Sequence, residues 1–189
     1  MTSHIPTREE ALALLRELTQ GEPLIKHALA VEAVMRFMAL KLHEDEDKWG
    51  VIGLIHDLDY EKFPEQHCAK TKAILEERGW PEEYVRAAIS HGWEACSDVA
   101  PLSVLEKTLY AVDELTGLVA ACALVRPSKS VMDLAPASVL KKWKQKGFAA
   151  GVNRGVIEKG AQMLGFGLEE LVSDVIMGMR EAAPQIGLG

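Results

Sequence analysis

The sequence predicts an all-α protein, and three observations lead to this prediction. Apolar residues recur every three or four positions, as they do along one face of an amphipathic helix. The clearest series is Leu24, Ala28, Val31, Met35 and Met38. Two segments have the capping-box pattern of helix starts, one at Thr7 and Glu10 and one at Ser103 and Glu106. No stretch of useful length alternates apolar and polar residues as a half-buried strand would. We therefore expect a single-domain helical bundle.

Three helices are expected in the first third of the chain. The first begins at the capping box of Thr7, runs to about residue 19 and ends before Gly21-Glu22-Pro23. The second covers about 24–42 and carries the apolar series described above. The acidic segment 43–47 follows and is expected to be solvated. The third helix covers about 48–58 and ends with the dipeptide His56-Asp57.

The remaining expected helices cover about 64–78, 81–91, 103–125, 152–164 and 168–182. Pro64 and Pro81 fit the first turns of two of them, where a missing N–H leaves no hydrogen bond unmade. Ser103 opens the longest one through its capping box. The region around Pro136 is expected to be looser and includes a short basic segment.

Composition narrows the class of protein. The 189 residues fit one domain, predicted over 1–189, and the net charge of −7 argues against nucleic-acid and anionic-membrane partners. Cys68, Cys96 and Cys122 have no CxxC spacing, so free thiols in a reducing cytoplasm are expected. The N-terminus lacks the apolar core of a signal peptide. The apolar run 109–125 contains Asp113, which favours a buried helix over a membrane span. We expect a cytoplasmic protein.

The most informative feature is His56-Asp57, which follows the apolar run 51–55. Ionisable groups beside a core need a partner or a metal ion. Adjacent helical residues point about 100° apart, so both side chains reach one ion only near a helix end. A capping pair at a helix end is the alternative interpretation.

Other candidate ligands have alternatives of their own. Asp113 lies in an apolar helix, followed by the small residues Thr116 and Gly117 that leave room for a ligand. A buried Asp held by hydrogen bonds or by an Arg is the competing interpretation. Taken alone, His27 is more readily explained as a satisfied helix histidine, and His67 as a surface residue. For His91 the alternative is a partner for the helix dipole.

The order His27, His56-Asp57, Asp113 resembles the HD superfamily of metal-dependent phosphohydrolases, over about residues 20–125. The resemblance implies that these residues bind a divalent metal inside an HD-type bundle, with accessory helices in about 126–189. Two-metal members, such as HD-GYP phosphodiesterases, have two more histidines before the last Asp, where this chain has His67 and His91. By this resemblance Asp57 would bridge two ions. The chain has no GYP motif after His91, so cyclic-dinucleotide specificity is not implied.

The resemblance predicts hydrolysis of a small phosphorylated substrate, such as a nucleotide, by metal-activated water. One or two ions of Mn, Fe, Co, Ni or Zn suit the His and Asp ligands. Asp57 is the central catalytic candidate, and Asp59, Glu61 and Lys62 are possible helpers, with a surface location as the alternative. A basic late region suggests a phosphate-binding rim of Lys141, Lys142 and Arg154, against the alternative of a solvated face.

Two other functions stay open from the sequence. Inositol oxygenase and related HD enzymes have a similar ligand order but use two irons and oxygen to cleave C–C or C–P bonds. A non-catalytic module that binds a nucleotide and signals to a partner is the second alternative. Fold analogy alone does not choose among the three.

Overall fold

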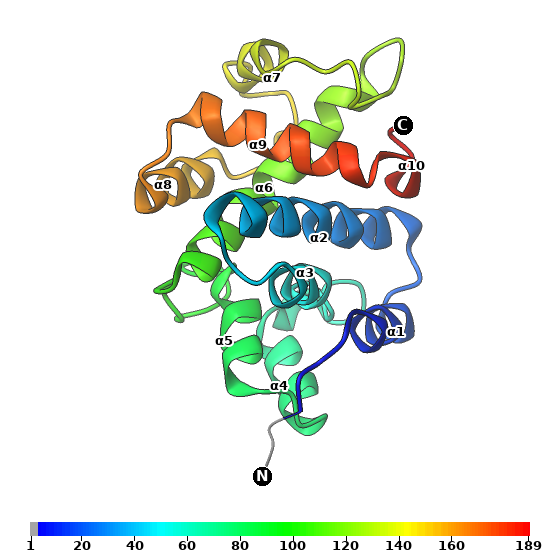
Figure 1. The fold of residues 1–189 in the computed structure, drawn as a ribbon, viewed down its shortest axis with the longest axis vertical. Coiled ribbons are helices and arrows are strands. Elements are labelled where there is room, and N and C mark those ends of the chain that lie inside the picture. Colours follow the sequence, from blue (N-terminus) through cyan, green and yellow to red (C-terminus); the bar gives the residue numbers. More distant parts are fainter. Residues whose placement is uncertain (1–3) are drawn as a thin grey trace.

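The computed structural model describes residues 4–189, which form helices joined by loops (Figure 1). Over this range no strand occurs, and only an isolated bridge joins Trp93 and Ser97. The predicted all-α class is therefore confirmed. The elements are α1 (Arg8–Leu18), α2 (Glu22–Leu42), α3 (Glu46–Ile55), the 3-10 helix η1 (Pro64–Gln66), α4 (Ala69–Glu77), α5 (Glu82–Ser90), α6 (Val104–Leu124), α7 (Pro136–Trp143), α8 (Arg154–Leu164), α9 (Leu168–Glu181) and α10 (Ala183–Ile186).

Two long helices, α2 and α6, organise the packing. Each has 21 residues, and α2 packs against α3, α6 and α9 while α6 also contacts α5, α7, α8 and α9. Figure 1 shows α3 and α9 on different sides of α2. Helices surrounded in this way carry apolar residues around much of their circumference. The helices after residue 126 pack directly on α2 and α6, and the division into a core and an accessory region stays a prediction.

Helix starts agree well with their sequence signals. Both predicted capping boxes are present, at Thr7 and Glu10 and at Ser103 and Glu106. The acidic segment after α2 does more than contact solvent, because the Asp45 side chain accepts a hydrogen bond from the Lys48 amide at 3.0 Å. This cap starts α3 two residues earlier than predicted.

Two regions differ from the predictions. The helix expected over 64–78 is divided, because η1 ends before Cys68 and α4 begins only at Ala69. The region expected to be loose contains α7, which begins at Pro136 and buries Val139. Pro136 thus occupies a first-turn position, where proline favours a helix.

A close approach of two helices positions the His56-Asp57 dipeptide. A Cβ on Gly53 of α3 would lie 2.9 Å from Cα of Glu32 in α2, which is closer than real side chains approach. Only glycine permits this approach. The end of α3 is thereby held against the helix that carries His27.

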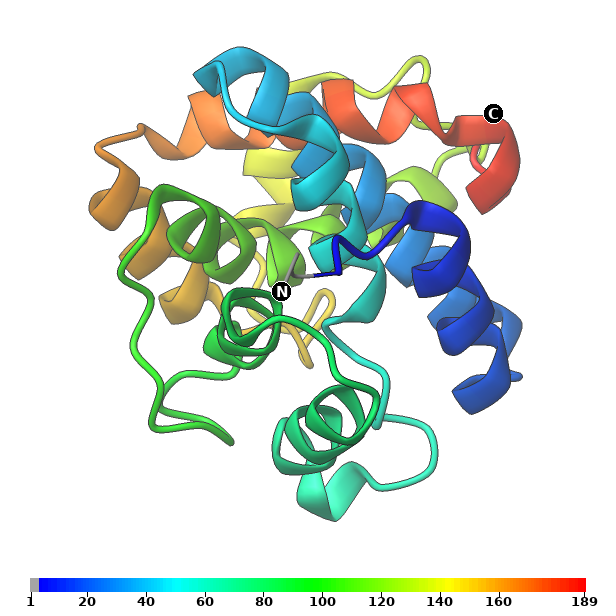
Figure 2. The same ribbon diagram turned by 60° about the horizontal axis from the view of Figure 1, so that its bottom comes forward.

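The helices α4 and α5 pack on each other as a pair, as Figure 2 shows from a second side. This pair brings the segment before α4 and the end of α5 together. Among the described residues, no helix combines the length and the apolar composition needed to cross a membrane.

Candidate metal centre

The end of α3 brings two adjacent side chains to one point. The helix ends at Ile55, His56 is its C-cap, and Asp57 lies in the turn that follows. Nε2 of His56 and Oδ2 of Asp57 are 3.5 Å apart. The His56 side chain is completely buried, while the Asp57 side chain is 20% exposed. The dipeptide thus reaches from the core to solvent.

Four side chains from three parts of the fold form a first donor set. His27 from α2 places its Nε2 2.9 Å from Oδ1 of Asp113 in α6 and 3.9 Å from Oδ2 of Asp57. His56 Nε2 lies 3.3 Å from the same Asp113 oxygen. Ligand atoms of His27, His56 and Asp57 all lie within 4.8 Å of one another, and Asp113 lies against both histidines.

A second donor set lies on the other side of the Asp57 carboxylate. His67 precedes α4 and His91 ends α5, and their Nε2 atoms are 3.1 Å apart. Oδ1 of Asp57 lies 3.5 Å from the His67 nitrogen and 3.2 Å from the His91 nitrogen. Asp57 therefore faces the first set with Oδ2 and the second set with Oδ1.

Hydrogen bonds on the far side of the rings orient three of the histidines. His56 Nδ1 donates to the Gly53 carbonyl at 2.8 Å, and His91 Nδ1 donates to the Ala88 carbonyl at 2.5 Å. His67 Nδ1 lies 2.7 Å from a carboxylate oxygen of Asp59. A carbonyl or a carboxylate only accepts, so Nδ1 carries a proton in each ring, and Nε2, the atom that would bind a metal ion, faces the cluster. Metal-binding histidines are oriented in this manner.

The buried Nε2 of His56 indicates that this arrangement fits a cation. It has no hydrogen-bond partner among the described residues, although Asp113 and Asp57 oxygens surround it. A lone pair that faces carboxylate oxygens is unfavourable unless a proton or a metal ion lies between them. Imidazole nitrogens with carboxylate oxygens suit divalent Mn, Fe, Co, Ni or Zn. The six side chains therefore could hold such ions.

Electrostatics in the cluster favour the charged forms. Burial lowers the pKa of His56, but the charges of Asp57 and Asp113 outweigh burial and raise it above its ordinary value. Burial likewise opposes ionisation of Asp113, yet His56 and His27 hold the pKa of that carboxyl well below its usual range. Burial by itself would lower the pKa of His67. The hydrogen bond to Asp59 is the largest of the effects that instead raise this pKa, to about 10. The cluster is thus a site where negative carboxylates attract cations.

The structure gives the three predicted catalytic helpers contacts of a structural kind. Asp59 is fully buried, and its second oxygen accepts the Thr71 amide at 2.8 Å, so it lies behind His67. Glu61 accepts the Gln20 and Gly21 amides at 2.6 and 3.1 Å, next to the start of α2. Lys62 donates to the Glu17 carbonyl at 3.1 Å. Their catalytic roles stay predictions.

In the predicted phosphate rim, Arg154 and Lys142 also make contacts of a structural kind. The Arg154 guanidinium donates to the carbonyls of Trp143, Gln145 and Phe148, at 3.0, 3.3 and 2.7 Å respectively, and so fastens the loop between α7 and α8. Lys142 lies over the Phe148 ring, and Lys141 is exposed. The structure does not bring these three cations into contact with the six donors, and their role as a rim stays a prediction.

Space beside the donors is found along α6. A Cβ on Gly117 would meet no atom within 4 Å, so this face of the helix is open one turn after Asp113. Thr116, the other small residue noted in the sequence, is buried and donates to the Val112 carbonyl. The side chains of His27 and Asp113 are 24% and 17% exposed. The first donor set is therefore partly accessible to solvent.

Sequence reasoning missed one neighbour of the cluster. The sulfur of Cys68 and ring nitrogens of His67 and His91 all lie within 4.8 Å of one another. Cys96 follows His91 by five positions and lies against Cys68, with 2.9 Å between the sulfurs. Adjacency to His67 in the sequence was the available signal for Cys68.

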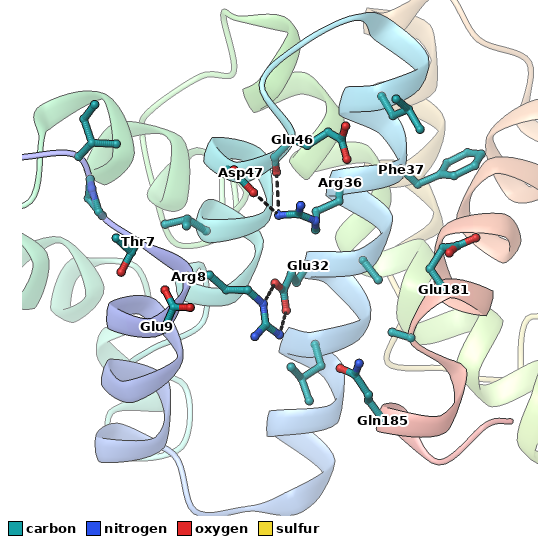
Figure 3. Close-up of a pocket in the computed structure, with 17 residues that line it drawn as sticks. Thr7, Arg8, Glu9, Glu32, Arg36, Phe37, Glu46, Asp47, Glu181 and Gln185 are labelled. Atoms are coloured by element: carbon teal, nitrogen blue, oxygen red, sulfur yellow. Dashed lines mark hydrogen bonds and ion pairs between the residues drawn. The ribbon is translucent and has the colours of Figure 1, made fainter.

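A large groove elsewhere on the surface contains none of the six donors. It has a volume of about 1010 Å³ and lies between the segment before α1, α2 and the C-terminal helices (Figure 3). Within it, Glu32 accepts two hydrogen bonds from Arg8, as Figure 3 shows. The groove is therefore separate from the candidate metal centre.

Comparison with known proteins identifies one family. A family model described as HD domain matches residues 24–118, slightly more than half of the chain. The matched segment begins just before His27, ends just after Asp113 and so contains all six donors. No curated protein and no solved structure matches the chain.

Proposed function

Because the chain belongs to the HD domain family, we propose that it is a metal-dependent phosphohydrolase that acts on a nucleotide or another small phosphoester. The observation that carries the proposal is the division of six donors into two sets that share the Asp57 carboxylate. When bound, one or two divalent transition ions would lower the pKa of a water molecule and neutralise phosphoryl oxygens. His27, His56, Asp57 and Asp113 would hold one ion, and His67, His91 and Asp57 the other.

The protein groups have separate tasks in this proposal. Asp57 presents one oxygen to each set and so fixes their separation. The carbonyls of Gly53 and Ala88 keep the His56 and His91 rings in the tautomer that presents Nε2. The partial exposure of His27 and Asp113 leaves an approach for the phosphoryl group, and Gly117 leaves space beside it. These features support hydrolysis at a site open to solvent.

The test combines metal content with activity. Protein purified without chelator is analysed by elemental mass spectrometry and assayed on phosphomonoesters and phosphodiesters, with His56→Ala and Asp57→Ala beside the native chain. We expect both variants to lose metal and activity together while circular dichroism shows an intact helical fold. His4→Ala is a matched control, because this exposed histidine pairs with Glu10 outside the cluster. Full activity after complete metal removal would refute the mechanism.

Two added measurements, of oxygen consumption and of nucleotide binding, separate the alternatives. Two irons per chain, with oxygen consumed as substrate is cleaved, would assign the site to oxygenase chemistry. Tight nucleotide binding without turnover, at full metal occupancy, would favour a binding module. Each of these two results would replace the phosphohydrolase proposal.

A further inference from the structure

Two cysteine sulfurs touch at the edge of the second donor set. Sγ of Cys68 and Sγ of Cys96 are 2.9 Å apart. This separation is within about 1 Å of the length of a disulfide bond, about 2.05 Å. Both residues carry free thiols in this structure. A small movement is therefore enough to bring the two sulfurs to bonding distance.

The backbone on the Cys68 side is held in an unusual turn. Cys68 has φ 65° and ψ −45°, and the Ala69 amide donates to the His67 carbonyl at 2.8 Å. This is a γ-turn with positive φ, a rare conformation for a residue other than glycine. The turn directs the Cys68 side chain away from its expected course along a helix and next to His67.

The Cys96 side is held by a tight turn after α5. The amides of Ala95, Cys96 and Ser97 all donate to the Gly92 carbonyl, at 3.0, 2.9 and 3.0 Å. A Cβ at Gly92 would collide with both cysteine sulfurs, so glycine leaves the space that they occupy. The two thiols are thus positioned by two separate pieces of local structure.

Exposure differs between the two thiols. Cys68 is buried, whereas Cys96 is exposed. Both line a cavity of about 800 Å³ whose walls also include Lys72 and Trp93. A small molecule that enters the cavity reaches Cys96 first, with Cys68 directly behind it. An accessible thiol beside a second, resolving thiol is the arrangement found in redox-sensitive cysteine pairs.

We propose that Cys68 and Cys96 are a redox-active pair that closes to a disulfide when hydrogen peroxide oxidises it. In the first step the Cys96 sulfur attacks one peroxide oxygen, the O–O bond breaks, and Cys96 sulfenic acid and one water form. In the second step the Cys68 sulfur attacks the Cys96 sulfur, the S–O bond breaks, and a second water leaves. The two thiol protons end in the waters, and two electrons pass from sulfur to the peroxide. A dithiol reductant reverses the change.

The cysteine pair lies next to both histidines of the second donor set. Cys68 directly follows His67, and Cys96 lies in the turn that directly follows His91. The disulfide would therefore join the two chain segments that supply one donor set. Its formation does not depend on the proposed phosphohydrolase activity, so the two proposals fail independently.

The test is a disulfide map of the metal-free native chain. Reduced protein is treated with equimolar hydrogen peroxide, blocked with iodoacetamide and digested with trypsin without reductant. We expect the peptide with Cys68 (residues 63–70) linked to the peptide with Cys96 (residues 87–107), and Cys122 alkylated as in untreated protein. The dithiol reductant should release both peptides.

Single substitutions assign the two steps. Cys122→Ser is the matched control, because this third cysteine is buried in α6 and should leave the cross-link unchanged. Cys68→Ser should stop at sulfenic acid on Cys96, and Cys96→Ser should leave Cys68 unoxidised. Failure of the native chain to cross-link, with both cysteines still alkylated or with Cys96 oxidised further, would overturn the proposal. The disulfide map of the native chain tests the proposal even if a variant does not fold.

Discussion

Replacing Asp59 with Asn tests whether a buried carboxylate controls the second donor set. Asp59 accepts from His67 Nδ1 with one oxygen and from the Thr71 amide with the other. Asparagine keeps only one oxygen, so its NH₂ group must face one of these two partners. If the NH₂ group faces Thr71, two hydrogen-bond donors face each other, because the Thr71 amide is also a donor. If the NH₂ group faces His67, the ring proton must move from Nδ1 to Nε2, where it blocks a metal ion.

The size of the effect follows from these contacts. A buried donor without a partner costs about 1–3 kcal/mol, and we expect the metal-free variant to lose that much free energy of unfolding. Loss of a carboxylate that orients a metal-binding histidine lowers metal affinity about 10–100-fold. This range corresponds to about 1.4–2.8 kcal/mol of binding free energy. The first donor set, which Asp59 does not contact in the structure, should keep its affinity.

The assay is a zinc titration of chelator-treated protein by calorimetry, with unfolding in denaturant followed by circular dichroism. Glu106→Gln is a matched control, because Glu106 is also a buried carboxylate and accepts the Leu102 and Ser103 amides while it pairs with Arg86. We expect the control to lose stability without a change in zinc affinity. Native zinc affinity in Asp59→Asn, or an equal loss in the control, would refute the reasoning.

Three further predictions concern packing and access. Gly53→Ala should lower the free energy of unfolding by about 1–3 kcal/mol in denaturant titration, because its Cβ meets the α2 backbone; native stability would contradict the close approach. Gly117→Phe should lower kcat/KM at unchanged metal content, because the ring fills the space beside Asp113. The control Gly117→Ala should leave the free energy of unfolding unchanged or raise it by up to about 1 kcal/mol. Equal kinetics in both variants would exclude that space as the substrate approach. Arg8→Met should destabilise the protein by about 2 kcal/mol, since it leaves Glu32 buried without its ion pair; this is measurable as a lower denaturant midpoint, and no change would show that solvent already screens the pair.

Local features of the fold could be predicted from the sequence. Helix caps at Thr7, Asn153 and Ser103 depend on side chains within three residues of the backbone they bind, and the apolar series of α2 depends only on helical spacing. The caps at Thr7 and Ser103 were predicted correctly. Asn153 starts α8 two residues later than the sequence indicated. The helix α7 was missed because it has only eight residues, so its periodic pattern covers little more than two turns.

The candidate site also has features that the sequence indicated and features that only the fold determined. The residues His56-Asp57 and Asp113 indicated a metal centre, because ionisable groups beside apolar segments need a partner. The order His27, His56-Asp57, Asp113 indicated one through its resemblance to the HD superfamily. Their distances, and the way Asp57 faces both donor sets, arise from the packing of α2, α3, α5 and α6. Asp59 was predicted as a catalytic helper, yet the fold buries it behind His67.

The range of the interactions explains why some features could be predicted from the sequence and others could not. Helix propensity, capping and periodicity act over a few residues, so the amino-acid order alone indicates the helices and the kinds of chemistry they carry. The contact between Cys68 and Cys96 spans 28 positions and needs both the γ-turn before α4 and the turn after α5. Contacts of this kind depend on how remote helices pack against each other, and a single sequence does not specify which side chains then meet.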